Sequence, residues 1–491
     1  MKQTTLFSFI LGATVLLLVK CTNSNSTQAP GAAGGGGLGT TRGGVITPVD
    51  FPKLDIQGFA FPQDSNVING WIHSDDLASQ YKHGWGIWAG LNQLTDQKGA
   101  FDDSLRVFET WRSPSEIIHI MQKGPLLAND PGIRSNRANL SRPNQFDNEG
   151  ASPDSIKDEN LNEARAYSPA AEAYALKNKI FSGIQLYDYA QKGNSIPSFP
   201  NNAISIKPTY VVLNLSKGAT TFLLSVWPPA AKTGYPNDVT HGYKMIEWGN
   251  SVQIDTKRTV SDPANKVFAL SDFIYYKMNK EDADAYNKAN DGETEVVAGD
   301  IAVLVAMHVT TREIANWTWQ TFWWMPDADN PASPSSKAIA DARPTQLKGA
   351  ARHYAMSVSN YMVNPNEPMA TSGKVIGKPN YGFNPYLEAG FRPGIFDSLN
   401  SKIYTKDRGV IPTGIGIRTN CMSCHRVASV NLAELADDNP SVRPSPRFVG
   451  DSYISPTNPV LKDKLLLDFA WSVRYNIDTT GLKAYIKNYK K

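Results

Sequence analysis

The sequence has few cysteines and little net charge. Its 491 residues include three cysteines, and 49 Lys and Arg residues nearly balance 46 Asp and Glu residues, which leaves a net charge of +3. Three cysteines make a poor disulfide framework. Because the charged residues are spread along the chain, they form no basic face of the kind that nucleic-acid binding needs. The composition therefore argues against a disulfide-stapled scaffold and predicts no nucleic-acid partner.

Several familiar active-site and membrane patterns are also missing. There is no G-x-S-x-G or H-E-x-x-H pattern, and the acidic turns at 290–295 and 327–330 lack the ligand spacing of an EF-hand. Beyond the N-terminal run, no apolar stretch is long enough to span a membrane. No repeat with a period of roughly 20–50 residues is present. The N-terminus and the cysteines are therefore the most informative parts of the sequence.

The N-terminus has the pattern of an export signal. Lys2 precedes an apolar run at 6–19, and Lys20 and Cys21 follow it. The run has the length of a secretory signal core and is too short to span a bilayer with margin. Residues 1–21 are therefore predicted to be a signal peptide. Cys21 also resembles the lipidated cysteine of a bacterial lipoprotein signal, although Lys20 stands where that signal has a small residue.

Residues 22–50 are polar and rich in Gly, Ser and Thr. Such a segment cannot bury enough apolar surface to fold, so we expect a flexible tether. Signal and tether together predict export to the bacterial cell envelope. The protein is then either periplasmic or a lipoprotein attached to the inner or outer membrane through Cys21. An ordinary cleaved signal with an unused cysteine is the alternative to lipidation.

The rest of the chain is long enough for two domains and predicts an α+β protein. Residues 51–340 contain short β-branched and aromatic runs bounded by polar turns, for example at 207–215 and 301–310. These runs predict a β-rich, sandwich-like N-terminal domain. Residues 341–491 predict a small helical, cytochrome c-like haem domain, and the Ala-rich stretch 337–362 is compatible with a helix. The reason for expecting haem there is a short motif.

The sequence "CMSCH" contains Cys421 and Cys424, with His425 directly behind them. On a helix, positions i, i+3 and i+4 share one face, so the three side chains can reach one planar ligand. C-x-x-C-H is the attachment signature of a c-type haem, in which two thioethers hold the porphyrin and the histidine is the proximal iron ligand. The motif predicts one covalently attached haem c.

Three other uses of the cysteine pair are less compatible with the sequence. A zinc site needs two further Cys or His ligands at knuckle-like spacing, and none follows His425. A thioredoxin-like redox pair lies between a strand and a helix of a βαβ unit, and this neighbourhood lacks that pattern. A disulfide across two intervening residues is strained. Covalent haem is therefore the favoured prediction, ahead of the redox pair and zinc.

The distal iron ligand is harder to predict. Only 66 residues follow His425 and none is Met or His, so a sixth ligand has to come from upstream. The candidates in the second domain are Met356, Met362, Met369 and His353, and those from the first domain are His308 and Met325. We expect His353 and Met356 to share a helical face. An open sixth position that binds water or a substrate is the alternative.

Four blocks in the second half of the chain resemble a known family. They are "HVTTREIANWTWQTFWW" (308–324), "FNPYLEAGF" (383–391), "TNCMSCHRVASV" (419–430) and "LLLDFAWSVRYNI" (465–477). In this order they are similar to a largely uncharacterised family of exported bacterial mono-haem cytochrome c-like proteins, over roughly residues 308–477. The resemblance implies haem binding by Cys421, Cys424 and His425 and, by analogy, electron transfer.

Two functions are compatible with these patterns. In the first, the protein is an electron carrier whose haem meets a redox partner protein at the cell envelope. In the second, it is a haem enzyme or sensor with an open distal iron position, acting on peroxide or a small ligand. The second function needs a distal acid–base group, for which the candidates are His308 and His353. The sequence identifies no catalytic residue beyond these candidates.

Overall fold

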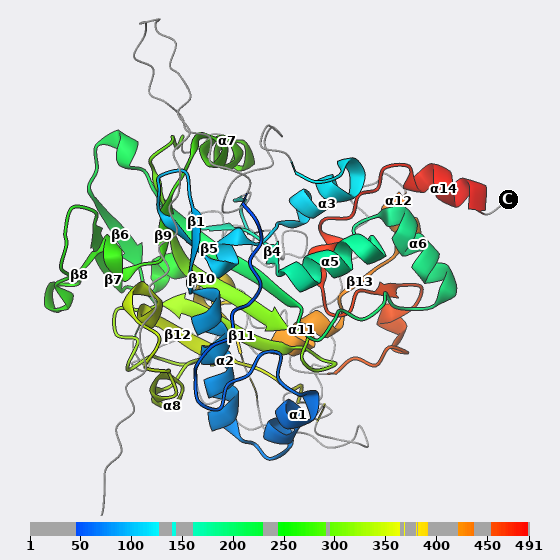
Figure 1. The fold of residues 1–491 in the computed structure, drawn as a ribbon, viewed down its shortest axis with the longest axis horizontal. Helices are drawn as coiled ribbons and strands as arrows, with labels where there is room; N and C mark the ends of the chain where they lie inside the picture. Colours follow the sequence, from blue (N-terminus) through cyan, green and yellow to red (C-terminus); the bar gives the residue numbers. More distant parts are fainter. Residues whose placement is uncertain are drawn as a thin grey trace, which may run out of the picture. The chain divides into compact units, whose positions relative to one another are not determined.

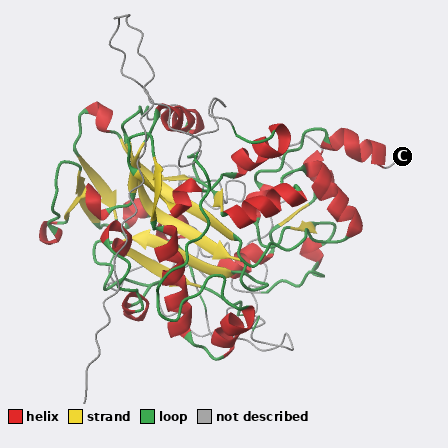
Figure 2. Ribbon diagram, viewed as in Figure 1, coloured by secondary structure: helices red, strands yellow, loops and turns green. Residues whose placement is uncertain are grey.

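The fold is mixed α+β, as the sequence predicts (Figure 1, Figure 2). The computed structural model describes residues 46–126, 140–143, 161–228, 244–290, 295–363, 368, 380, 382–390, 421–436 and 453–489. Residues 42–491 form one compact unit. None of the described helices is both long enough and apolar enough to cross a membrane. The sandwich-like arrangement and the division into two domains at residue 341 stay predictions.

The described α-helices are mostly short and lie around the sheets. They are α1 (Ser65–His73), α2 (Leu77–Leu91), α3 (Pro114–Lys123), α5 (Pro169–Asn178), α6 (Gly183–Lys192), α7 (Lys280–Ala289), α8 (Lys337–Asp341), α9 (Pro385–Glu388), α11 (Cys421–Arg426), α12 (Leu432–Ala436), α13 (Trp471–Arg474) and α14 (Leu482–Tyr489).

A seven-stranded antiparallel sheet is the largest sheet of the described chain. Its main order is β12-β11-β10-β5-β3, with β9 beside β10 and β4 beside β5. The strands are β12 (Tyr354–Val358), β11 (Thr318–Trp324), β10 (Ile301–Thr311), β5 (Ile204–Leu213), β3 (Leu161–Glu163), β4 (Ala166–Tyr167) and β9 (Tyr275–Lys277). The strands expected at 207–215 and 301–310 are thus confirmed as β5 and β10.

Three smaller sheets lie beside this central sheet. They are formed by β1 (Leu94–Lys98) with β2 (Ser104–Arg106), by β6 (Thr221–Ser225) with β7 (Ser251–Asp255) and β8 (Val267–Ala269), and by β13 (Ser429–Val430) with β14 (Leu465–Leu466). The pair β13–β14 joins the segment that follows α11 to the C-terminal part of the chain.

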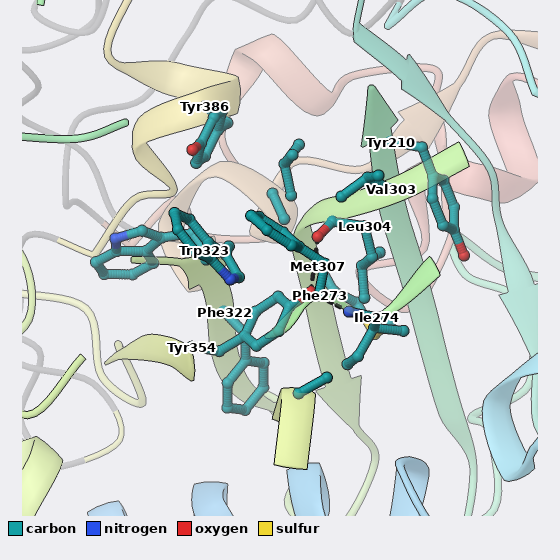
Figure 3. Close-up of a cluster of buried hydrophobic side chains, with 14 of the residues drawn as sticks. Tyr210, Phe273, Ile274, Val303, Leu304, Met307, Phe322, Trp323, Tyr354 and Tyr386 are labelled. Atoms are coloured by element: carbon teal, nitrogen blue, oxygen red, sulfur yellow. Dashed lines mark hydrogen bonds between the residues drawn. The ribbon is translucent and has the colours of Figure 1, made fainter. Parts of the chain in front are cut away.

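The stretch 337–362 is not one helix, and that expectation was wrong. Only α8 is α-helical there, and the strand β12 adds an edge to the central sheet. Tyr354 anchors this strand: its hydroxyl donates to the Leu304 carbonyl over 2.7 Å and accepts from the Ile274 N–H over 3.4 Å (Figure 3). Burial against the sheet therefore outweighs the helix propensity of the Ala-rich sequence. His353 and Met356 consequently share no helical face.

The two faces of the central sheet are covered by different helices. Side chains alternate along a strand, so Met356 and its register partner Phe322 point to one face. Helix α2 packs there, because a Cβ added to Gly84 would lie 2.8 Å from Met356 Sδ. We call this the α2 face. Trp319 and Thr321 of β11 point the opposite way, toward α11 and α9, and we call that side the α11 face.

An N-terminal arm, residues 46–61, packs along the outside of α2. Two glycines of α2 make room for its aromatic rings. A Cβ on Gly86 would lie 2.0 Å from Phe59 Cδ2, and one on Gly90 would lie 2.1 Å from Phe51 Cζ. These distances are far below van der Waals contact, so the arm depends on the absence of side chains at both positions.

We predict that Gly86→Ala destabilises the protein, because moving the Phe59 ring away from α2 costs about 1–3 kcal/mol. The gain of about 1 kcal/mol that alanine normally gives in a helix offsets part of this cost and leaves a net loss of up to about 2 kcal/mol. Gly70→Ala in α1 is the matched control, since nothing lies within 4 Å of its added Cβ. Chemical denaturation measures both, and a Gly86→Ala variant as stable as Gly70→Ala would contradict the packing of the arm.

Candidate functional site

The helix expected at the C-x-x-C-H motif is present as α11. Hydrogen bonds from outside the helix hold both cysteines in place. The Cys421 N–H donates to Ser359 Oγ over 3.3 Å, and Trp471 Nε1 donates to the Cys424 carbonyl over 3.1 Å. Helix α11 places the three motif residues, Cys421, Cys424 and His425, at positions i, i+3 and i+4 of one helical turn. The helix lies on the α11 face of the central sheet.

His425 is oriented by a hydrogen bond and by an aromatic ring. Its Nδ1 lies 2.7 Å from the Phe469 carbonyl, which can only accept, so Nδ1 carries the proton. The imidazole packs on Trp319 with ring centroids 4.3 Å apart. Burial lowers the pKa of His425 to about 3, although the Phe469 carbonyl favours the charged form. The ring is therefore neutral, with its lone pair on Nε2.

The Phe469 carbonyl is presented by a strained loop. Asp468 and Phe469 have φ angles of 46° and 67°, which side-chain-bearing residues rarely adopt. Asp468 Oδ2 accepts a hydrogen bond from the Phe199 N–H over 3.0 Å and pairs with Arg312 Nε over 3.0 Å. Arg312 directly follows β10, so this ion pair ties the loop to the central sheet. Strain of this kind persists only where surrounding contacts enforce it.

Cys421 and Cys424 are half-buried free thiols. Cys421 Sγ lies 3.7 Å from the Gly382 carbonyl, its hydrogen-bond acceptor. Burial raises the pKa of each thiol to about 12, and the nearby Glu388 carboxylate adds to the shift. Both are therefore protonated at neutral pH. A redox cysteine pair or a zinc site uses thiolates, which this environment disfavours.

The alternative of a protein-only metal site has no further support. Across the described ranges, no group of three or more His, Cys, Asp and Glu side chains is arranged to hold a metal ion. The motif residues themselves supply one neutral imidazole and two protonated thiols, which is the donor set that covalent haem attachment uses.

A row of charged side chains lies on the α11 face. In the sheet register, His308 of β10 stands opposite Thr321 of β11 on one side and Lys207 of β5 on the other. His308 Nε2 lies 2.9 Å from Glu388 Oε1 of α9. Lys207 Nζ lies 3.2 Å from Glu163 Oε2 of β3, and Arg165 also pairs with Glu163. We call Glu388, His308, Lys207, Glu163 and Arg165 the charged row.

Helix α9 fixes the Glu388 end of this row. Asn384 Nδ2 donates to Thr321 Oγ1 over 2.8 Å and to the Phe322 carbonyl over 2.9 Å, which pins the start of α9 to β11. The Asn384 N–H also donates to Glu388 Oε2. Glu388 is thus held between its own helix and His308 on the sheet.

The charged row is within electrostatic reach of α11. Burial dominates the raised pKa of Cys424, but Glu388 raises it further and Lys207 opposes it. Burial likewise dominates the lowered pKa of His425, and the neighbouring basic side chains of His308 and Lys207 add to the shift. The motif and the row therefore belong to one site, built from α9, α11 and three strands of the sheet.

Two of the distal candidates lie away from this site. Met356 points to the α2 face, where it contacts Gly84. His353 precedes β12 at the end opposite Ser359, the residue that contacts Cys421. Six residues of extended chain separate His353 from Ser359 by about 20 Å. His353 lies instead beside Asp272, with Nε2 and Oδ1 3.7 Å apart, and burial lowers its pKa.

Met362 is placed differently from these two. It is fully buried in the same hydrophobic cluster as Met422 of α11 and Trp319. Met325 follows β11 and lies in the cluster that surrounds α2. Met369 and Cys21 lie outside the described residues. The sixth iron ligand and the lipidation of Cys21 stay predictions.

Several residues of the site are missing from the sequence-based prediction. His308 is among the sequence-based candidates, but only the register of β10 with β11 shows that it shares a face with Trp319. Nothing in the sequence marks the Phe469 carbonyl, because the contact comes from main chain in a loop. Glu388 and Lys207 look like ordinary surface charges until the sheet register and α9 bring them to His308.

Comparison with family models, with curated proteins and with solved structures finds no match to this chain.

Glu163 is a buried carboxylate of the charged row, and its burial predicts that the stability of the protein depends on pH. Burial alone would raise the pKa of Glu163, but Lys207 and Arg165 outweigh it and hold this pKa below its usual range. A folded-state pKa below the unfolded one stabilises the fold at neutral pH, and this stabilisation is lost as the pH falls through the folded pKa. Glu163→Gln should therefore cost about 3–5 kcal/mol at neutral pH, with the difference from wild type shrinking in acid.

Urea unfolding at successively lower pH measures this difference. Asp284→Asn in α7 is the matched control, because the Lys280–Asp284 pair has 71% and 61% of its side chains exposed. Loss of this exposed pair should leave the stability close to that of the wild type at every pH. A Glu163→Gln deficit that stays constant across the pH range would contradict the assignment.

Proposed function

We propose that the protein is an exported c-type cytochrome that carries electrons at the cell envelope. One haem c is attached through Cys421 and Cys424, and His425 is the proximal iron ligand. The observation that carries this proposal is the hydrogen bond from His425 Nδ1 to the Phe469 carbonyl. Metal-ligating histidines commonly donate their second ring N–H in this way, which leaves Nε2 for the metal.

The chain's own residues fit this group. No described residue hydrogen-bonds to His425 Nε2, and both thiols are free of disulfide bonds. Each thiol would add its S–H across one vinyl group of the porphyrin, which forms a thioether and leaves no by-product. Bound there, haem supplies a one-electron redox centre. Trp319 packs on His425 and limits rotation of the proximal ring.

The proposed location and partners follow from the N-terminal pattern and from the family resemblance. A signal peptide followed by a Gly-rich tether delivers the protein to the envelope, where covalent haem attachment takes place. Lipid on Cys21 would hold it at the inner or outer membrane. The carrier function then requires a redox partner protein that meets the exposed part of the haem, and it requires no nucleic acid.

A second function is a haem enzyme or sensor with an open distal position. The charged row favours it, since a site used only for electron transfer has no need for a partly buried His–Glu pair beside the motif. The two functions share the same haem attachment and differ in what binds at the iron.

Haem attachment is tested by producing the protein in a host that matures c-type cytochromes. We expect covalent haem bands in the absorption spectrum and an intact mass increased by one haem. The Cys421→Ser/Cys424→Ser variant should lose both signals. Cys21→Ser is the matched control and should retain the haem. Wild-type protein without covalent haem, made in a host that matures a control cytochrome, would refute the proposal.

The membrane anchor is tested by fractionation and by mass spectrometry of the mature N-terminus. We expect wild-type protein in the membrane fraction with a lipidated Cys21 as its first residue. Cys21→Ser should move the protein to the soluble fraction. An unlipidated chain that begins beyond residue 21 would remove the anchor and leave a periplasmic protein.

A further inference from the structure

Two histidines are candidates for a distal acid–base group, and the structure pairs both with carboxylates. His308 Nε2 lies 2.9 Å from Glu388 Oε1, and His353 Nε2 lies 3.7 Å from Asp272 Oδ1. Only the first pair meets the hydrogen-bond distance. Only His308 lies on the α11 face, two residues along the sheet from the Trp319 row that carries His425. The two pairs thus share their chemistry but differ in location.

The proton arrangement of His308 follows from its partner. His308 and Lys207 hold the pKa of Glu388 below its usual range, although burial alone would raise it, so Glu388 is a carboxylate at neutral pH. A carboxylate only accepts, hence His308 donates through Nε2–H. When His308 is neutral, its lone pair is therefore on Nδ1, which has no hydrogen-bond partner in the described part of the chain.

We infer that His308 and Glu388 form an acid–base couple that removes the proton from a small weak acid, such as hydrogen peroxide or hydrogen cyanide, at the haem site. This inference rests on the proposed haem attachment, because the resulting anion is the form that ferric iron binds. In the step, the O–H or C–H bond of the ligand breaks and an N–H bond forms at His308 Nδ1. The anion keeps the electron pair, and no oxidant or reductant is needed.

The neighbouring charges suit this role. Glu388 stabilises the imidazolium that forms, as a carboxylate does for the histidine of a catalytic triad. Lys207, directly across the sheet, would oppose that charge, and Glu163 offsets only part of it because Glu163 also pairs with Arg165. The pinned helix α9 holds Glu388 in position before any ligand arrives.

Direct ligation of the iron by His308 is the competing use of this residue. The Glu388 bond occupies Nε2, the ring nitrogen farthest from the backbone and the one that reaches a metal most easily. Ligation through Nε2 would break this bond and cost Glu388 its contact with the central sheet. Ligation through Nδ1 would bring the strand backbone close to the porphyrin. The geometry therefore favours proton transfer over ligation.

The test is the rate of cyanide binding to the ferric, haem-loaded protein, measured by stopped flow across the neutral pH range. Haem content and urea unfolding are measured first for every variant. His308→Gln should slow cyanide binding about 100-fold, in line with the usual contribution of a positioned base. Glu388→Gln keeps His308 in place and should give a smaller reduction in rate.

His353→Gln is the matched control, since it removes a half-buried histidine with a carboxylate neighbour at the far end of β12. It should bind cyanide as fast as wild type. An unchanged rate in both His308→Gln and Glu388→Gln overturns the inference. The inference is also overturned if His308→Gln changes the resting spectrum from low spin to high spin and binds cyanide faster. His308 would then be an iron ligand. Wild-type protein without haem overturns the proposed function as well, and the haem content identifies that outcome.

Discussion

The hydrogen bond between His425 Nδ1 and the Phe469 carbonyl is the contact on which the rest of the site depends. It selects the tautomer of the imidazole and joins segments that are 44 residues apart in sequence. The accepting carbonyl lies in a loop where Asp468 and Phe469 both have positive φ angles, and each strained backbone conformation costs roughly 1–3 kcal/mol. The charge-assisted contacts of Asp468 with Arg312 and Phe199 offset this cost.

The α11 face of the central sheet differs chemically from the α2 face. On the α2 face, aromatic and aliphatic side chains such as Phe322 and Met356 pack against the helix. On the α11 face, the charged row places two carboxylates and three basic groups under α9 and α11. Burying charges is costly, and hydrophobic substitutes of equal volume are often at least as stable. Their presence beside the motif is thus better explained by chemistry at the site than by stability.

The parts of the structure that local sequence patterns encode were predicted well. β-branched runs identify β5 and β10, and the spacing of Cys421, Cys424 and His425 is enough to expect the helical turn of α11. The stretch around Tyr354 was expected to be helical because its local propensity is helical. It forms a strand instead, which is held by a contact of Tyr354 with Leu304, 50 residues away. Glu388 and Phe469 reach the site through loop and main-chain contacts. Residue identity alone does not encode these contacts.

The arm at 46–61 matters for more than packing if the chain is anchored at its N-terminus. Mechanical load on an anchored chain enters the described fold at Ile46. It meets the hydrogen bonds of Thr47 and Val49 with the segment 97–111 first, and then the rings of Phe51 and Phe59. Those rings rest on α2, which covers the sheet face opposite to α11. A pull on the tether would therefore peel the arm from α2 before it strained the His425 contacts.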